Sequence, residues 1–163
     1  MATTKLNETR LDIPGPARAT LVGLLNARLA DAIDWGLQLK QAHWNVKGRN
    51  FVALHELFDE MVSQAQDHAD LIAERAVMLG GQARGTLQTV AAETTLKEYP
   101  VQASAALDHL TALADRLGKM GAQVRAAIDE SDKLGDKDTA DLFTEVSRGL
   151  DKQLWYLEAH LAD

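Results

Sequence analysis

Residues 51–81, FVALHELFDEMVSQAQDHADLIAERAVMLGG, decide the fold because an apolar stripe runs the whole length of the segment. The stripe begins at Phe51 and recurs at helical spacing to Leu79, which predicts a long amphipathic helix. The glycine pair Gly80–Gly81 is a stop signal. The segment therefore indicates one element of a helical bundle.

A line of polar residues follows one flank of this stripe. At about 100° per residue, an arc of about 100° holds His55, Asp59, Asp70 and Glu74. For His55 and Asp59 alone, an ordinary solvated i,i+4 pair is a sufficient explanation. Asp70 and Glu74 instead repel each other by a few tenths of a kcal/mol unless a cation or a basic group lies between them, and the nearby Arg75 points about 100° away from Glu74. The acidic pair therefore favours a bound cation.

Three further long helices are predicted from the same periodicity. The first, over residues 19–44, follows the Pro14-Gly15-Pro16 start signal, and its apolar stripe extends to His43, which we expect to face inward. The others are expected over about residues 101–128 and around residues 143–157. No stretch is typical of a strand.

The connection between the second and third long helices is unusually long. Residues 82–100, QARGTLQTVAAETTLKEYP, exceed the usual 2–8 residues of a bundle connection and can carry a short helix near residues 87–92. We predict an all-α fold, a ferritin-like four-helix bundle with a long crossover between the second and third helices that carries this short helix. Coiled-coil and cytokine-like bundles stay open on pattern alone. The expected organisation is an N-terminal tail over residues 1–15 and one bundle domain over residues 16–163.

Composition narrows the class of function. The 163 residues include no cysteine, which excludes disulfides, thiolate metal sites and thiol-based peroxide chemistry. No apolar run reaches the roughly 20 residues of a membrane span, and the N-terminus lacks the apolar core of a signal peptide, so we expect a cytoplasmic protein. The net charge of −7 disfavours broad attraction to nucleic acid or anionic lipid and suits cations.

Five side chains together suggest a metal site of two imidazoles and three carboxylates. This donor set suits iron(II), manganese or zinc, and iron is favoured where open positions remain for an oxidant. Taken alone, the inward-facing His43 is more typical of a hydrogen-bonded core residue than of a metal ligand. The candidate ligands are His43, His55, Asp59, Asp70 and Glu74.

One chain cannot assemble these ligands around one site. Asp59 and Asp70 are eleven residues apart, hence about 16 Å along one helix. The Glu-x-x-His arrangement of intrachain di-iron bundles is also absent. The economical arrangement is two half-sites that meet between chains, across a two-fold axis near Gln64–Ala65.

Residues 40–81, with the segments TLKEYP, GDKDTADLF and LDKQLWYLEAHL, resemble the Dps family, the DNA-binding proteins from starved cells within the ferritin-like superfamily. The resemblance covers the chain after about residue 16, and the five candidate ligands match the family's ferroxidase residues without substitution. It implies a di-iron site at the subunit interface of a hollow twelve-chain shell. Such a shell would oxidise iron(II), preferably with hydrogen peroxide, store a ferric mineral core and protect DNA from oxidative damage.

The resemblance also implies an acidic three-fold pore lined by Asp132, Asp136 and Asp141. Acids are common at helix starts, which is the simpler explanation of this cluster. Lys40, one turn before His43, is a candidate hydrogen-bond partner of a ligand carboxylate, or else an ordinary surface lysine.

The tail bears on the family's other activity, DNA condensation through a lysine-rich N-terminus. Here Lys5 and Arg10 are offset by Glu8 and Asp12, so binding to DNA should be weak at physiological salt. A nucleoid-binding structural protein is therefore the alternative to an iron-oxidising storage protein. A metal-free helical interaction protein is a third hypothesis, and it requires the ligand set to be coincidental.

Overall fold

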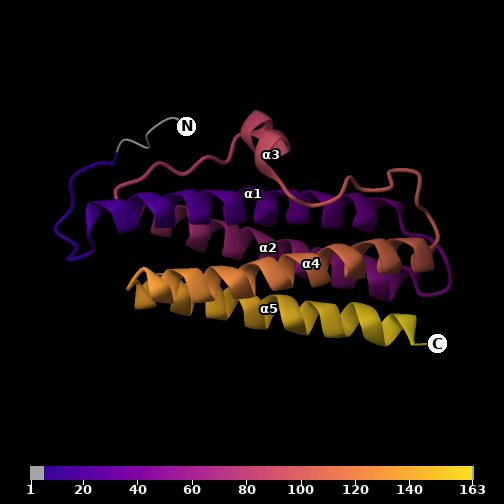
Figure 1. Cartoon of the computed structure of the whole chain (residues 1–163). Helices are drawn as coiled ribbons and strands as arrows, with labels where there is room; N and C mark the ends of the chain where they lie inside the picture. Colours follow the sequence, from indigo (N-terminus) through magenta and orange to yellow (C-terminus); the bar gives the residue numbers. More distant parts are fainter. Residues whose placement is uncertain (1–5, 163) are drawn as a thin grey trace.

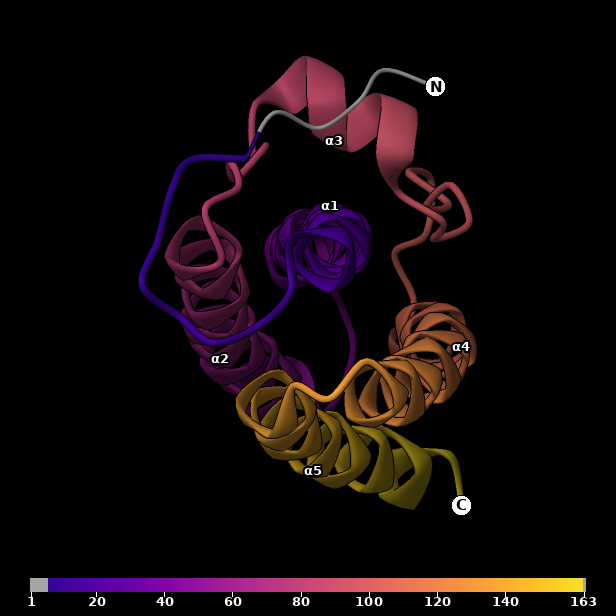
Figure 2. The same cartoon turned by 60° about the vertical axis from the view of Figure 1, so that its left-hand side comes forward.

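The computed structural model describes residues 6–162, and in this range all regular elements are helices apart from an isolated bridge between Lys47 and Ala105. Four long helices lie side by side as a bundle, and a short helix lies outside it, over α1 (Figures 1 and 2). The elements are α1 Gly15–Asn45, α2 Phe51–Met78, α3 Leu87–Glu93, α4 Ala106–Lys133 and α5 Lys137–Leu161. The predicted all-α bundle and the short helix in its long crossover are confirmed. Within the described range, no helix combines the length and apolar character that a membrane span requires.

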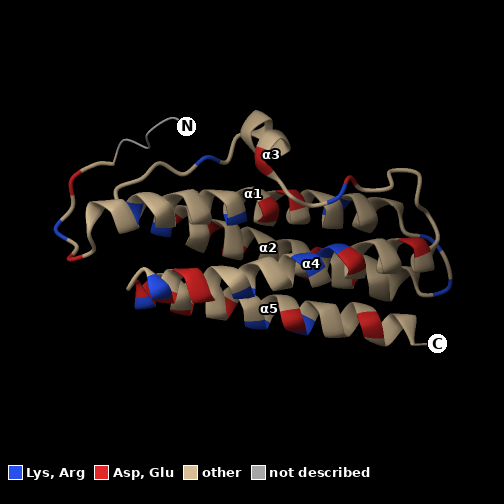
Figure 3. Ribbon diagram, viewed as in Figure 1, with Lys and Arg blue, Asp and Glu red and all other residues tan. Residues whose placement is uncertain are grey.

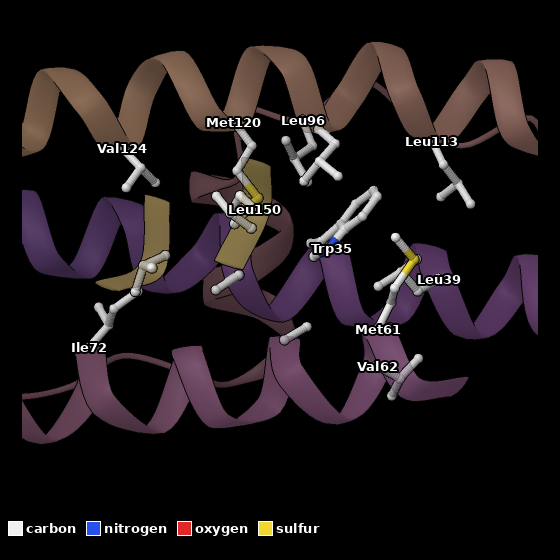
Figure 4. Close-up of a cluster of buried hydrophobic side chains, with 14 of the residues drawn as sticks. Trp35, Leu39, Met61, Val62, Ile72, Leu96, Leu113, Met120, Val124 and Leu150 are labelled. Atoms are coloured by element: carbon white, nitrogen blue, oxygen red, sulfur yellow. The ribbon is translucent and has the colours of Figure 1, made fainter. Parts of the chain in front are cut away.

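The core is built from the facing stripes of the four long helices. Figure 4 shows Trp35 of α1 between Met61 of α2 and Met120 of α4. The buried indole keeps a partner for its N–H, which donates to Gln153 Oε1 at 3.2 Å. Gln153 in turn donates to Gln64 Oε1 at 3.0 Å. The large ring thus fills the centre of the bundle without leaving a polar group unpaired.

A tight reversal joins α1 to α2 and determines where the site lies. Val46 has an extended backbone, and Gly48 has a φ of 123°, a backbone conformation that residues with a Cβ rarely adopt. The Lys47 amide donates to the carbonyl oxygen of Ser104 at 2.9 Å, which fixes the loop to the chain just before α4. The last turn of α1 therefore lies beside the first turns of α2.

Polar side chains of α1 hold the crossover in place. Asn26 Oδ1 accepts the Arg84 amide at 2.9 Å, and Asp31 Oδ1 accepts the Thr95 amide at 2.7 Å. Asp31 is completely buried and also pairs with Arg28 at 3.0 Å. These bonds satisfy backbone groups of an irregular segment and fix its path along the bundle.

Two details of the sequence-based prediction were wrong. The third long helix, predicted over about residues 101–128, is α4 at Ala106–Lys133, because residues before it form a turn in which the Ala103 amide donates to the Pro100 carbonyl. Phe51, where the predicted apolar stripe begins, is 44% exposed, and Leu107 is 63% exposed. Both residues lie in the first turn of a helix, and the two helices begin at the same end of the bundle (Figure 1).

A buried ion pair ties α2 to the start of α5. Arg75 Nη2 lies 2.7 Å from Asp136 Oδ1, and Arg75 Nε donates to Thr139 Oγ1 at 2.9 Å. Asp136 is also the N-cap of α5, since its Oδ1 accepts the Thr139 amide at 3.0 Å. Asp136 is only 2% exposed. A charge this deeply buried depends on its partner.

We predict that Asp136→Ala lowers the free energy of unfolding by about 3–5 kcal/mol, because it leaves the buried Arg75 charge unpaired and removes a helix cap. The matched control is Asp138→Ala. Asp138 lies 3.9 Å from Arg75 with 86% of its side chain exposed, so its removal should cost less than about 1 kcal/mol. Denaturant unfolding at one fixed protein concentration measures both. Equal losses in the two variants would contradict this role for the buried pair.

Candidate metal half-site

Two histidines stack against each other where α1 and α2 meet. The ring centroids of His43 and His55 are 3.7 Å apart, with an angle of 19° between the ring planes. His43 is buried, as the helical period predicted, and His55 is partly buried. The tight reversal between the helices allows this contact, since it places the end of α1 against the second turn of α2.

The histidines hold each other in one tautomer through reciprocal backbone contacts. His43 Nδ1 lies 2.7 Å from the carbonyl oxygen of His55, and His55 Nδ1 lies 2.9 Å from the carbonyl oxygen of His43. A carbonyl oxygen can only accept, so each Nδ1 must carry the proton. In the neutral rings, each Nε2 then keeps its lone pair, which is the arrangement of a metal-ligating histidine.

A carboxylate and an ammonium group lie beside the histidine pair. Asp59, one turn after His55 on α2, pairs with the Lys40 ammonium, and the side chains are 53% and 32% exposed. The hydrogen bond from Lys40 lowers the pKa of Asp59 below its ordinary value. Desolvation raises this pKa by a smaller amount, and the positive charges of Lys40, His43 and His55 lower it further. Asp59 is therefore ionised at neutral pH. The expected contact between Lys40 and a candidate ligand carboxylate is present.

A groove runs along the α1–α2 face from this cluster toward Asp70. It consists of two hollows of about 330 and 300 Å³ that share Ile33, Gln66 and Ala69 in their walls. Lys40 and Asp59 line the first hollow, and Asp70 lines the second. The floor of the first is built from small residues: Ala32, Gly36, Ala65 and Ala69.

Helical periodicity alone does not reveal this floor, because small residues at helical spacing are also typical of a core stripe. A Cβ added at Gly36 would lie 3.7 Å from the Cβ of Ala65, so the two helices approach closely there. The available signal was the pairing of small residues four apart on both helices, Ala32 with Gly36 and Ala65 with Ala69. That pattern indicates a shallow surface on which another helix could lie.

The second acidic pair lies apart from the histidines. Asp70 and Glu74 are exposed on α2, and Asp70 is about 16 Å along the helix from Asp59. Across residues 6–162, no three histidine, aspartate or glutamate side chains come together as a metal-binding group. The structure thus brings His43 against His55, places Asp59 one turn further along α2 at the groove, and leaves the two remaining acids at a distance.

The structure corrects one of the three residues expected in an acidic pore. Asp136 is buried against Arg75 and caps α5, so it cannot line an open channel. Asp132 is half exposed and pairs with Lys137, and Asp141 is exposed. The spacing of acids at the helix start did not reveal which of them points into the bundle.

The N-terminal segment is fixed to the bundle from residue 6 onward. The Asn7 amide donates to the Gly80 carbonyl at 2.7 Å, and Arg18 Nη1 donates to the Leu79 carbonyl at 2.9 Å. Ile13 packs against the core. Lys5, a basic residue of the predicted tail, lies outside the described residues. Figure 3 shows basic and acidic residues interspersed along the helices.

Comparisons with known proteins agree with this architecture. Residues 22–163 match the model of the ferritin-like domain. The chain is 50% identical to the DNA protection during starvation protein of Agrobacterium fabrum, over 98% of both chains. It superimposes on DpsA14 from Streptomyces coelicolor with a TM-score of 0.94 at 37% identity, covering 99% of this chain and 96% of the other. Mycobacterium smegmatis Dps gives a TM-score of 0.92 at 30% identity, covering 96% of each chain.

The family model spans nearly the whole bundle, and half of the aligned residues are identical in the Agrobacterium protein. The chain therefore belongs to the Dps family of ferritin-like proteins.

Proposed function

We propose that this protein oxidises iron(II) and stores the ferric product inside a hollow homo-oligomer, a dodecamer built from two-fold dimers. The observation that carries the proposal is the reciprocal His43–His55 pair, in which the Nδ1 contacts leave the lone pair of each Nε2 for a metal, with the ionised Asp59 one turn further along α2. A cytoplasmic location suits this activity. Removal of iron(II) and peroxide would protect DNA without contact with it, which accords with the name of the Agrobacterium relative.

The complete site forms between two chains. Asp59 and Asp70 are equally distant from the point between Gln64 and Ala65, and so are His55 and Glu74. If α2 crosses α2 of a second copy antiparallel at that point, one two-fold axis matches both pairs. The groove floor at Ala65 gives the second copy room to approach. Each dimer then carries two equivalent sites, each with a histidine half from one chain and an acidic half from the other.

The side chains divide the chemistry between them. Imidazole nitrogen holds iron(II), whereas carboxylates favour the harder ferric ion. Manganese and zinc suit similar donors and would compete with iron. Two iron(II) ions supply the two electrons that convert one hydrogen peroxide and two protons to two waters, so no hydroxyl radical is released. The ionised Asp59 contributes negative charge without first losing a proton.

For the pore, we propose only Asp132 and Asp141 as acidic residues of an iron entry route. Both are exposed near the start of α5, where their field would concentrate cations. Lys137 offsets part of the charge of Asp132.

The first test of the function compares oxidants. We expect protein loaded anaerobically with about two iron(II) ions per site to be oxidised faster by hydrogen peroxide than by oxygen, because one peroxide accepts both electrons of an iron pair. Rapid-mixing absorbance measures both rates. The double variant His43→Ala/Asp70→Ala should fall to the rate of iron in buffer, since each site loses a ligand from each half. Unchanged oxidation in that variant would remove the assignment.

The second test addresses the sharing of sites between chains. One variant lacks His43 and His55, and another lacks Asp70 and Glu74, so neither has an intact site alone. In a mixed dimer, both lesions fall in one site and the other site is whole. Random co-assembly of equal amounts should therefore restore about a quarter of wild-type ferroxidation.

The matched control for this mixing experiment co-assembles two other chains: the Asp59→Asn variant and the variant that lacks His43 and His55. Both lesions then affect the same half of the site, so no mixed dimer contains an intact site and no recovery is expected. The shared site would be contradicted if particles contain both the histidine-deficient variant and the variant without Asp70 and Glu74, yet recover no ferroxidation.

The alternative function, DNA condensation, requires a basic segment that can reach DNA. Because the chain is docked from Asn7 onward by Gly80 and Arg18, we expect little of the tail to be available. We predict weak binding near pH 7 that is detectable at about 50 mM salt and lost at about 200 mM, since phosphate contacts are strongly salt-dependent. A gel-shift series over salt measures it. Tight complexes at the higher salt would favour the nucleoid-binding function.

A further inference from the structure

A tyrosine and a histidine form a buried hydrogen bond where the crossover reaches α4. Tyr99 of the crossover is buried, His109 of α4 is completely buried, and the Tyr99 hydroxyl oxygen lies 2.6 Å from His109 Nδ1. Burial raises the pKa of the Tyr99 hydroxyl, so the phenol stays protonated. Because Nδ1 is the one hydrogen-bond partner of this hydroxyl among the described residues, the hydroxyl donates and the neutral imidazole accepts.

This bond holds a segment that in turn holds the tight reversal between α1 and α2. Residues 99–105 connect Tyr99 to the start of α4, and within them the Ser104 carbonyl accepts the Lys47 amide at 2.9 Å. Ala105 also forms the isolated bridge with Lys47. The path of the reversal therefore depends on a segment whose first residue is fixed by the bond to His109.

The surroundings of His109 oppose a positive charge on its ring. Arg116 Cζ lies 5.3 Å from the centre of the Tyr99 ring, and this buried guanidinium has no carboxylate partner among the described residues. His109 Nε2 has no hydrogen-bond partner of good geometry in the same range. Burial lowers the pKa of His109, against smaller opposing effects of the Asn45 carbonyl and the exposed Asp108.

We propose that the Tyr99–His109 pair is an acid-sensitive tie: it holds residues 99–105 while His109 is neutral, and it releases them and the reversal when the ring takes up a proton. A protonated ring has no lone pair for the Tyr99 hydroxyl, whose proton then loses its acceptor. The ring also becomes a second cation near the buried Arg116, and opening of the segment to water relieves this penalty. Neither step requires iron, so the tie is independent of the proposed function.

The direction of the pH effect follows from the closed and open states of the segment. In the closed state the pKa of His109 is below its ordinary value of 6.5, and in the open state it returns to about that value. Below about pH 6.5 the open state therefore binds more protons, so acid favours opening by at most about tenfold per pH unit for one group. Well above pH 6.5 neither state holds the proton and the effect vanishes.

The experiment is hydrogen exchange of the assembled protein, measured by mass spectrometry between about pH 7.5 and 5.5. After correction for the intrinsic pH dependence of exchange, the protection of the Lys47 and Ala103 amides should fall by about tenfold toward the lower pH. The internal control is the Asn7 amide, which donates to the Gly80 carbonyl just beyond the far end of α2. Its protection should not change.

Two variants remove the titrating group and keep a hydrogen-bond acceptor. His109→Asn and His109→Gln offer the Tyr99 hydroxyl an amide oxygen, so protection at the two amides should no longer depend on pH. The matched control is His160→Asn, which removes a partly buried histidine at the end of α5 and should behave as the wild type. His43 and His55 are present in all of these chains, so their own titration does not distinguish one chain from another.

Three results would overturn the tie. The wild type could lose less than about twofold protection at Lys47 and Ala103 over this range. It could lose protection equally at Asn7, which would indicate that the whole bundle opens. The His109 variants could keep the pH dependence of the wild type, which would assign it to another group. If neither variant assembles, the comparison of the two ends of the bundle in the wild type decides.

Discussion

The rise of an α-helix, about 1.5 Å per residue, is the constraint on which the functional account depends. It separates Asp59 from Asp70 on α2 by about 16 Å, so one chain cannot close one metal site around both. The same helix places its polar residues symmetrically about the point between Gln64 and Ala65, where the surface is shallow. A long, uninterrupted α2 therefore explains why one chain cannot complete the proposed site, and in the proposed dimer it is also the element through which a second copy would complete it.

Two ion pairs of similar composition have different roles because of burial. Arg75 and Asp136 lie inside the bundle, with further hydrogen bonds to Thr139, and they fix the start of α5. Lys40 and Asp59 lie at a solvent-accessible groove, where the net gain from such a pair is small. Loss of the exposed pair would therefore cost little stability, whereas loss of one partner of the buried pair leaves an unpaired charge inside the bundle. Exposure thus separates an ion pair that fixes the framework from one that does not.

Much of the fold could be predicted because local periodicity is directly visible in the sequence. The stripes of α1 and α2, the inward position of His43 and the short helix in the crossover all follow from 3.6-residue spacing and stop signals. Asp136 could not be placed in this way, because its partner Arg75 is 61 residues away and only the packing of α2 on α5 brings them together. The stacked histidine rings likewise depend on the tight α1–α2 reversal. The proposed contribution of a second chain follows from the spacing of Asp59 and Asp70 along one helix and from the absence of a Glu-x-x-His arrangement.

The central claim is that one iron site is built by two chains. The most direct measurement is anomalous X-ray scattering from crystals of the assembled particle soaked with iron(II) under anaerobic conditions, with data collected on both sides of the iron absorption edge. The account predicts iron peaks at each two-fold interface, between His43, His55 and Asp59 of one subunit and the partner's Asp70 and Glu74. Iron bound only by residues of a single chain, or absent from these interfaces in fully soaked crystals, would contradict it.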